Sequence, residues 1–225
     1  MAIGKNGAAV RWGGRIPAAV LRDPRLTPSA KAIYCYICGR AADTGGVELG
    51  HLDIASDVGL SAHSFYTHFR GLYRLGYVGV KKYGVCRRNL YELVVVPDGA
   101  LFLPADTEGL SEQDLAFYRR VARHGVYCLG TCTVPESLML DDRLKPQEKA
   151  LYCYLAAVTG NGEEDSPSRA QIVHDMCLSP ATIQGYKRRL TGLGWITARQ
   201  VYSNGRFRGC SYGFPDRLPA ADEEA

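Results

Sequence analysis

The chain has 225 residues, of which 46% are hydrophobic and 22% are charged, and its formal net charge is +4. This length suits two compact domains, each with a modest hydrophobic core. No apolar run approaches the length of a bilayer span, and no long apolar segment stands at the start of the chain, so we expect a soluble, cytoplasmic protein that is not exported.

The first predicted domain comprises residues 9–96. Thr27 is an N-cap, Pro28 is a proline at the first helical position, and apolar residues follow at helical spacing. These signals predict a helix with a buried stripe, which ends before Gly45. A short extended segment, residues 47–49, then leads into the next helices.

Residues 52–78 predict two helices separated by a tight turn. Gly59 can take the left-handed conformation that such a turn needs, Ser61 is a good N-cap for the second helix, and Gly76 ends that helix. One face of the second helix is apolar, and the other carries hydrogen-bonding and cationic side chains that a core does not need. This arrangement is typical of helix-turn-helix DNA recognition.

Two strand-like segments, residues 77–83 and 90–96, follow around a basic tip of sequence GVCRR. A hairpin after the second helix is a wing, so the first domain is predicted to be a winged helix-turn-helix. Residues 97–124 predict a helical connector, because Ser111 and the acids after it open an amphipathic helix.

The second predicted domain, residues 125–216, repeats the first. A shift of 118 positions lays residues 16–78 onto residues 134–196 without a gap, and 18 of the 63 aligned positions are identical. Chance similarity does not keep its register over this distance, so we infer two copies of one small domain. Residues 217–225 predict an acidic tail.

Acidic residues are missing from both predicted reading surfaces. Residues 58–91 and 176–215 together hold 12 of the 27 cationic side chains and none of the 23 acidic ones. A surface that meets phosphates gains from excluding carboxylates, which favours nucleic acid as the partner. The alternative is a protein-docking module whose basic face meets an acidic partner.

The candidate DNA-binding residues lie on the second helix of each pair and on the hairpins. Arg70 and Arg188 occupy the same outward position in the two copies, and we expect both to contact phosphate or guanine. Lys187 replaces Phe69 at a nominal core position, so either its stem lies along the core or the helix is rotated slightly. The full set is His63, Tyr66, Thr67, Arg70, Arg74, Lys81, Lys82, Arg87, Arg88, Gln184, Lys187, Arg188, Arg199, Arg206 and Arg208.

The sequence offers no pattern for catalysis. It has no phosphate-binding glycine loop, no paired carboxylates in a plausible site and no nucleophile with an evident base, so we expect no enzyme and no cofactor. The eight cysteines do not form two CxxC pairs at zinc-finger spacing. We interpret them as small buried thiols rather than as metal ligands.

The segments IPAAVLRDPRLTPSAKAIYCYI and LDIASDVGLSAHSFYTHFRGLYRLGYV resemble the winged helix-turn-helix domain of Gram-positive bacterial, phage and plasmid replication proteins. That group includes the amino-terminal domains of DnaD-like primosome proteins and replisome organisers. The second copy is similar to it as well, so the resemblance covers most of the chain. It implies a role in DNA replication, with replisome proteins as further partners.

Together these features predict an α+β, mainly helical protein with two tandem winged helix-turn-helix domains joined by a helical connector. We expect it to bind double-stranded DNA sequence-specifically, as a replication initiator or replisome organiser of a plasmid, phage or integrated element. A winged-helix transcription regulator would have the same fold, and a structural adaptor would use the same domains for protein contacts. Neither a membrane partner nor a small-molecule ligand is expected.

Overall fold

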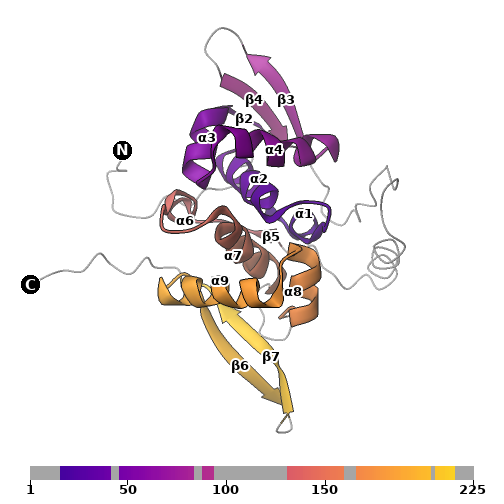
Figure 1. Ribbon diagram of the computed structural model, residues 1–225, viewed down its shortest axis with the longest axis vertical. Coiled ribbons are helices and arrows are strands. Elements are labelled where there is room, and N and C mark those ends of the chain that lie inside the picture. Colours follow the sequence, from indigo (N-terminus) through magenta and orange to yellow (C-terminus); the bar gives the residue numbers. More distant parts are fainter. Residues whose placement is uncertain are drawn as a thin grey trace, which may run out of the picture.

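The computed structural model describes residues 16–41, 46–83, 88–93, 131–159, 166–203 and 206–215, and it has an α+β structure made mainly of helices (Figure 1). The first half contains β1 (Ile16–Pro17), α1 (Ala18–Arg22), α2 (Pro28–Ala41), β2 (Gly46–Gly50), α3 (His51–Val58), α4 (Ala62–Arg74), β3 (Val78–Tyr83) and β4 (Arg88–Leu93). The second half contains β5 (Thr131–Cys132), α6 (Glu136–Leu140), α7 (Pro146–Thr159), α8 (Arg169–Met176), α9 (Pro180–Gly192), β6 (Thr197–Ser203) and β7 (Arg206–Gly213). The predicted connector at 97–124, the acidic tail at 217–225, and the ends of the predicted domains at 9–15 and 125–130 lie outside the described residues.

The helices of the two halves begin and end at matching positions. Pro28 opens α2 and Pro146 opens α7, and the same shift of 118 positions relates α1 to α6, α3 to α8 and α4 to α9. Both prolines stand at a helix start, where their fixed φ suits the helix and their missing N–H costs nothing. None of the described helices is long and apolar enough to cross a membrane.

Each half ends in an antiparallel hairpin. β3 pairs with β4 from Val78↔Leu93 to Tyr83↔Arg88, and β2 pairs with the other edge of β4, which gives the strand order β2-β4-β3. β6 pairs with β7, with an irregularity in register between Val201 and Tyr202. Within the described residues β7 has no second neighbouring strand, so the two sheets differ.

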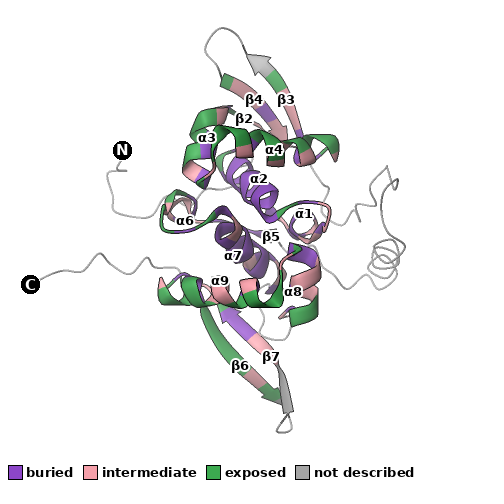
Figure 2. Cartoon of the chain, in the orientation of Figure 1, coloured by how far each residue is buried: buried purple, intermediate pink, exposed green. Residues whose placement is uncertain are grey.

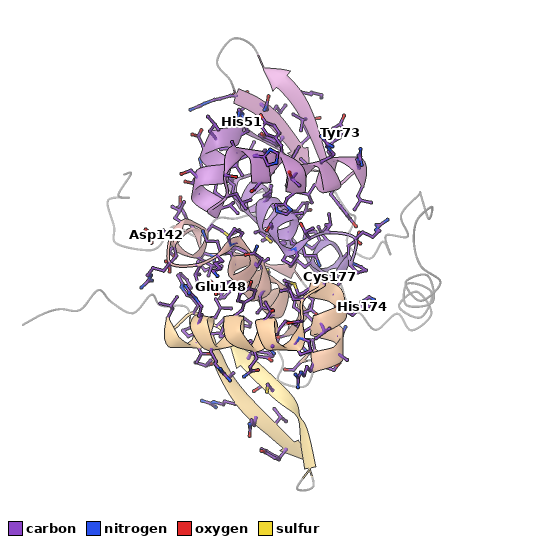
Figure 3. The ribbon with its side chains drawn as sticks, viewed as in Figure 1. His51, Tyr73, Asp142, Glu148, His174 and Cys177 are labelled. Carbon is purple, nitrogen blue, oxygen red and sulfur yellow. The ribbon has the colours of Figure 1, made fainter. Side chains whose placement is uncertain are left out.

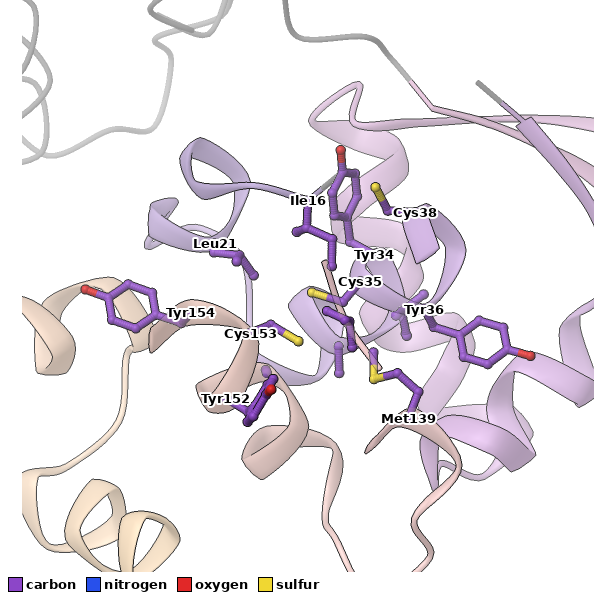
Figure 4. Close-up of a cluster of buried hydrophobic side chains, with 14 of the residues drawn as sticks. Ile16, Leu21, Tyr34, Cys35, Tyr36, Cys38, Met139, Tyr152, Cys153 and Tyr154 are labelled. Atoms are coloured by element: carbon purple, nitrogen blue, oxygen red, sulfur yellow. The ribbon is translucent and has the colours of Figure 1, made fainter. Parts of the chain in front are cut away.

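The two halves share one hydrophobic core, in which α2 packs against α7 (Figures 2 and 4). Every residue of α2 except Arg40 is buried, which exceeds the single stripe that the sequence predicted. The reason is that α7 of the other half covers the side of α2 that its own half leaves bare. β1 and β5 also pair antiparallel across the junction, with Ile16 opposite Cys132.

A buried lysine from each half reaches into the other half. Lys31 Nζ donates a hydrogen bond to the carbonyl oxygen of Asp175 in α8. Lys149 Nζ donates to the carbonyl of Asp57 in α3 at 2.9 Å and to that of Met139 at 2.6 Å. Carbonyls in the last turn of a helix lack intrahelical hydrogen-bond donors, and they lie at the negative end of the helix dipole. An ammonium group supplies the missing donor and also a favourable positive charge.

The carboxylates of the same two aspartates are held within their own halves. Tyr36 OH donates to Asp57 Oδ2 at 2.5 Å, and Tyr154 OH donates to Asp175 Oδ2 at 2.8 Å. Each aspartate therefore joins the first long helix of its own half through its side chain and that of the other half through its backbone.

Most of the described cysteines are buried thiols, as the sequence predicted. Cys35, Cys38, Cys132 and Cys153 lie in the shared core, whereas Cys177 is exposed at a turn.

Candidate nucleic-acid interface

The turn between the paired helices is built from local interactions that repeat in both halves. Gly59 has φ +86° and Cys177 has φ +49°, so both occupy the left-handed region at matching positions. Ser61 Oγ accepts a hydrogen bond from the Ser64 amide at 3.2 Å, and the Ser179 side chain accepts one from Thr182 at 3.1 Å. These caps fix where α4 and α9, which we call the recognition helices, begin.

The buried side of α4 packs against its own half. Phe65 and Leu72 are fully buried, and Phe69 lies half-buried between Phe65 and Tyr91, with ring centroids 5.2 and 5.6 Å away. His68 is half-buried, and its Nδ1 lies 3.0 Å from Thr27 Oγ1.

The outer face of α4 consists of exposed residues, and it contains all the candidates predicted on this helix. Tyr66 is 53% exposed, and Tyr73, which the prediction omitted, is 58% exposed near the C-terminal end of the helix (Figure 3). Tyr73 stands three positions after Arg70 and so belongs to the same stripe, a signal that helical spacing alone could have supplied. The outer face comprises His63, Tyr66, Thr67, Arg70, Tyr73 and Arg74.

The outer face of α9 carries fewer large polar and aromatic side chains than that of α4. Besides Pro180 and Gly192 at its two ends, the exposed residues of α9 are Ala181, Gln184, Arg188, Arg189 and Thr191. Arg188 matches Arg70 in position and exposure, whereas Arg189 was not predicted. Arg189 Nε lies 2.9 Å from Glu148 Oε1 on the neighbouring α7, and its guanidinium also donates to the carbonyl of Arg143 (Figure 3). This pairing makes Arg189 less available to an anion than Arg188.

Lys187 differs from the other predicted contacts because it is half-buried. Its Nζ donates to the hydroxyl of Tyr212 on β7 and lies 4.7 Å from the centre of that ring. Burial lowers the pKa of Lys187. Lys187 is thus partly buried, and its ammonium group faces the hairpin rather than the outer face of α9.

The hairpins contribute exposed cations as well. Arg88 on β4 and Arg199 on β6 are exposed. Lys81 on β3 forms an ion pair with Glu92 on β4, with Nζ and Oε1 2.7 Å apart. Glu92 lies one residue beyond the acid-free segment, and the pairing of the two strands brings it back beside Lys81. Arg87 and the side chains of Lys82, Arg206 and Arg208 lie outside what the structure describes.

Five exposed arginines of the recognition helices and hairpins have no hydrogen-bond or ion-pair partner among the described residues. They are Arg70, Arg74, Arg88, Arg188 and Arg199. They come from both recognition helices and both hairpins. Exposed, unpaired guanidinium groups on such elements can bind phosphates or guanine edges without first breaking an internal ion pair.

The second half has a groove beside its recognition helix, at a place where aromatic rings pack in the first half. This groove of about 820 Å³ lies between the N-terminal turns of α8 and α9 and strand β7, and its lining includes Ile172, Ile183 and Tyr212. At the matching place in the first half, Phe69 stacks on Phe65 and meets the ring of Tyr91 edge-on. The substitution of Lys187 for Phe69 removes one of these rings.

The comparisons agree with this geometry. A family model described as a helix-turn-helix domain matches residues 142–196, which include α7, α8 and α9. The comparison with curated proteins and the comparison with solved structures each found no match. Residues 142–196 are therefore a helix-turn-helix domain, and such a domain suggests that the chain binds DNA.

Proposed function

We propose that this chain is a sequence-specific double-stranded-DNA-binding protein with two winged helix-turn-helix units. The observation that carries the proposal is the pair of unpartnered arginines, Arg70 and Arg188, at the same outward position on α4 and α9. A recognition helix enters the major groove, where an arginine can bind guanine O6 and N7 together. Arg88 and Arg199 on the hairpins would bind the flanking phosphates.

We propose further that the process served is the initiation of replication of a plasmid, phage or integrated element, with replisome proteins as later partners. The support is the likeness of both halves to the domains of such replication proteins. A transcription regulator would use the same surfaces at promoters. In either role the chain acts by binding, and we propose no catalytic step.

The first experiment measures binding of the full chain to labelled duplex DNA by fluorescence anisotropy at increasing salt. If about six to ten phosphates are engaged, affinity should fall by about three to five orders of magnitude between low and moderate salt. The double variant Arg70→Ala with Arg188→Ala should bind more weakly at every salt concentration. Binding that does not depend on salt, or no binding at all, would favour the adaptor role instead.

A second experiment separates replication from transcription. Mapping the sites that the chain occupies in the DNA of its host should show one dominant cluster beside a replication origin if it is an initiator. Many scattered sites upstream of genes would identify a regulator.

A further inference from the structure

The contacts between the two halves occur in matched pairs. Lys31 contacts Asp175, and Lys149, its counterpart, contacts Asp57, the counterpart of Asp175. In the same way α1 packs against α8 while α3 packs against α6. Exchange of this kind defines an isologous interface, which a two-fold rotation produces and a translation does not.

Residues close to the axis of such a rotation contact their own counterparts. Gln147 Nε2 donates to Ser29 Oγ at 3.2 Å, and these residues stand at matching positions. Cys35 and Cys153 also match, and their thiols interact in the core (Figure 4). The axis therefore passes between α2 and α7.

Figure 1 shows the same relation for whole elements. Each helix lies across the centre of the molecule from its counterpart: α3 from α8, α1 from α6, and α4 from α9, with the hairpins at opposite ends. A two-fold rotation leaves height along its axis unchanged. The two recognition helices therefore lie at one level along the axis and are inverted relative to each other, although their sequences follow one another as direct repeats.

We infer that α4 and α9 bind one DNA duplex at two half-sites in inverted orientation, with a two-fold axis of the DNA lying on that of the protein. This inference rests on the proposed DNA binding. Duplex DNA has two-fold axes perpendicular to its length, so an inverted pair of reading helices matches inverted half-sites, with centres about one helical turn or a multiple of it apart.

The two arms of the site differ in sequence because the two outer faces differ. The residues of the α4 face other than Arg70 are replaced on α9, and only the pair Arg70 and Arg188 is common to both. The replacements are His63 by Ala181, Tyr66 by Gln184, Thr67 by Gly185, Tyr73 by Thr191 and Arg74 by Gly192. The natural site is thus an inverted pair with unequal arms, which a search for perfect palindromes would miss.

The test makes the two outer faces alike. The variant carries Ala181→His, Gln184→Tyr, Gly185→Thr, Thr191→Tyr and Gly192→Arg, so that α9 presents the outer-face residues of α4. Ala181, Gln184 and Thr191 are exposed, and a Cβ added at Gly185 or Gly192 meets nothing within 4 Å, so the changes fit the fold. The matched control makes the opposite changes on α4: His63→Ala, Tyr66→Gln, Thr67→Gly, Tyr73→Thr and Arg74→Gly.

Each full-length protein is used to select binding sites from random-sequence duplexes. Both symmetrised variants should select perfect inverted repeats, with a different arm for each variant, and the wild type should select one arm of each kind. Turning one arm around, to give a direct repeat, should weaken binding by about a hundredfold, because only one helix can then engage. Circular dichroism checks that each variant is folded, and either variant alone suffices for the test.

Two results would overturn the inference and leave DNA binding standing. One is selection of a direct repeat, and the other is selection of a single arm, which means that the two helices do not meet the same duplex. Absence of binding to any duplex at low salt would overturn the proposed function and the inference together.

Discussion

At the scale of single residues, Lys31 is an ionisable side chain buried in the shared core. Burial lowers its pKa from 10.5 to about 8, while nearby Asp175 acts in the opposite direction. Between these pH values the folded protein binds fewer protons at this site than the unfolded chain does, so stability rises with pH there.

Lys31→Met isolates this effect from the titration of the buried tyrosines and thiols. The free energy of unfolding of the wild type, minus that of the variant, should increase from about pH 8 to about pH 10.5, by up to about 1.4 kcal/mol per pH unit. Urea titrations of both proteins across this range measure the difference. A difference that stays constant or falls with pH would show that Lys31 is not charged and buried as described.

Substitutions of Arg70 and Arg188 should affect DNA binding and not stability, because both side chains are exposed and lack described partners. Arg70→Ala or Arg188→Ala should each cost about 1–3 kcal/mol of DNA-binding free energy and leave the melting temperature unchanged. Arg40→Ala is the control, since it removes one positive charge from the last turn of α2, where Arg40 lies 3.9 Å from Glu136 of α6. If Arg40→Ala weakens binding as much as the others, the outer faces are not the contact surface.

At the scale of elements, the turns before the two recognition helices can be compared, because they have the same backbone conformation with different residues. Gly59 and Cys177 occupy the same left-handed position, which costs an L-residue about 1–2 kcal/mol and glycine almost nothing. Gly59→Ala should therefore lower the free energy of unfolding by about 1 kcal/mol. Thermal denaturation of Gly59→Ala beside Ser56→Ala, an exposed position on the same helix, tests this, and equal melting temperatures would contradict it.

The first hairpin yields a prediction in which binding improves. Glu92 neutralises Lys81 across the strands, with side chains that are both well exposed. Glu92→Gln should tighten DNA binding and steepen its salt dependence by about one phosphate contact, while stability changes little because exposed ion pairs contribute little. Weaker binding by Glu92→Gln would mean that Glu92 positions Lys81 rather than competing with DNA for it.

Local signals in the sequence predicted α2, α3 and α4 because the limits of these helices depend on neighbouring residues, whereas the short helices α1 and α6 were not predicted. Pro28 opens α2 and Ser61 caps α4 as expected, and Pro146 and Ser179 do the same at the matching positions. Glu92 beside Lys81 and Lys187 beside Tyr212 could not be found in this way. Each pair depends on how strands and helices meet, which counting charges along the chain does not reveal.

The packing of α2 against the other half was not predicted from the sequence, although the composition of α2 indicated it. Apolar residues surround this helix almost completely, and such a helix is buried on all sides. From the sequence alone, Lys31 within this apolar helix would be expected to face solvent. The structure shows that it is buried and donates to a carbonyl on α8 instead.

At the scale of the whole molecule, the shared core implies that the halves depend on each other. Residues 1–97 and 125–225, produced separately, should not give folded monomers, because each would expose a long helix that is buried on nearly every side. Mixing the two fragments should restore a folded complex through the same helix pair. Circular dichroism and sedimentation measure both outcomes, and a monomeric fragment with its own cooperative melting transition would contradict this prediction.

The two-fold relation also affects what a mutation can do. In a symmetric homodimer every substitution appears twice, so any change in one reading surface is imposed on the other. In this chain a substitution appears once, and Lys187 in place of Phe69 has altered one half while the other keeps its aromatic stack. Covalent linkage of the two halves thus allows each arm of a binding site to diverge separately, while Lys31 and Lys149 still join the two halves through their hydrogen bonds.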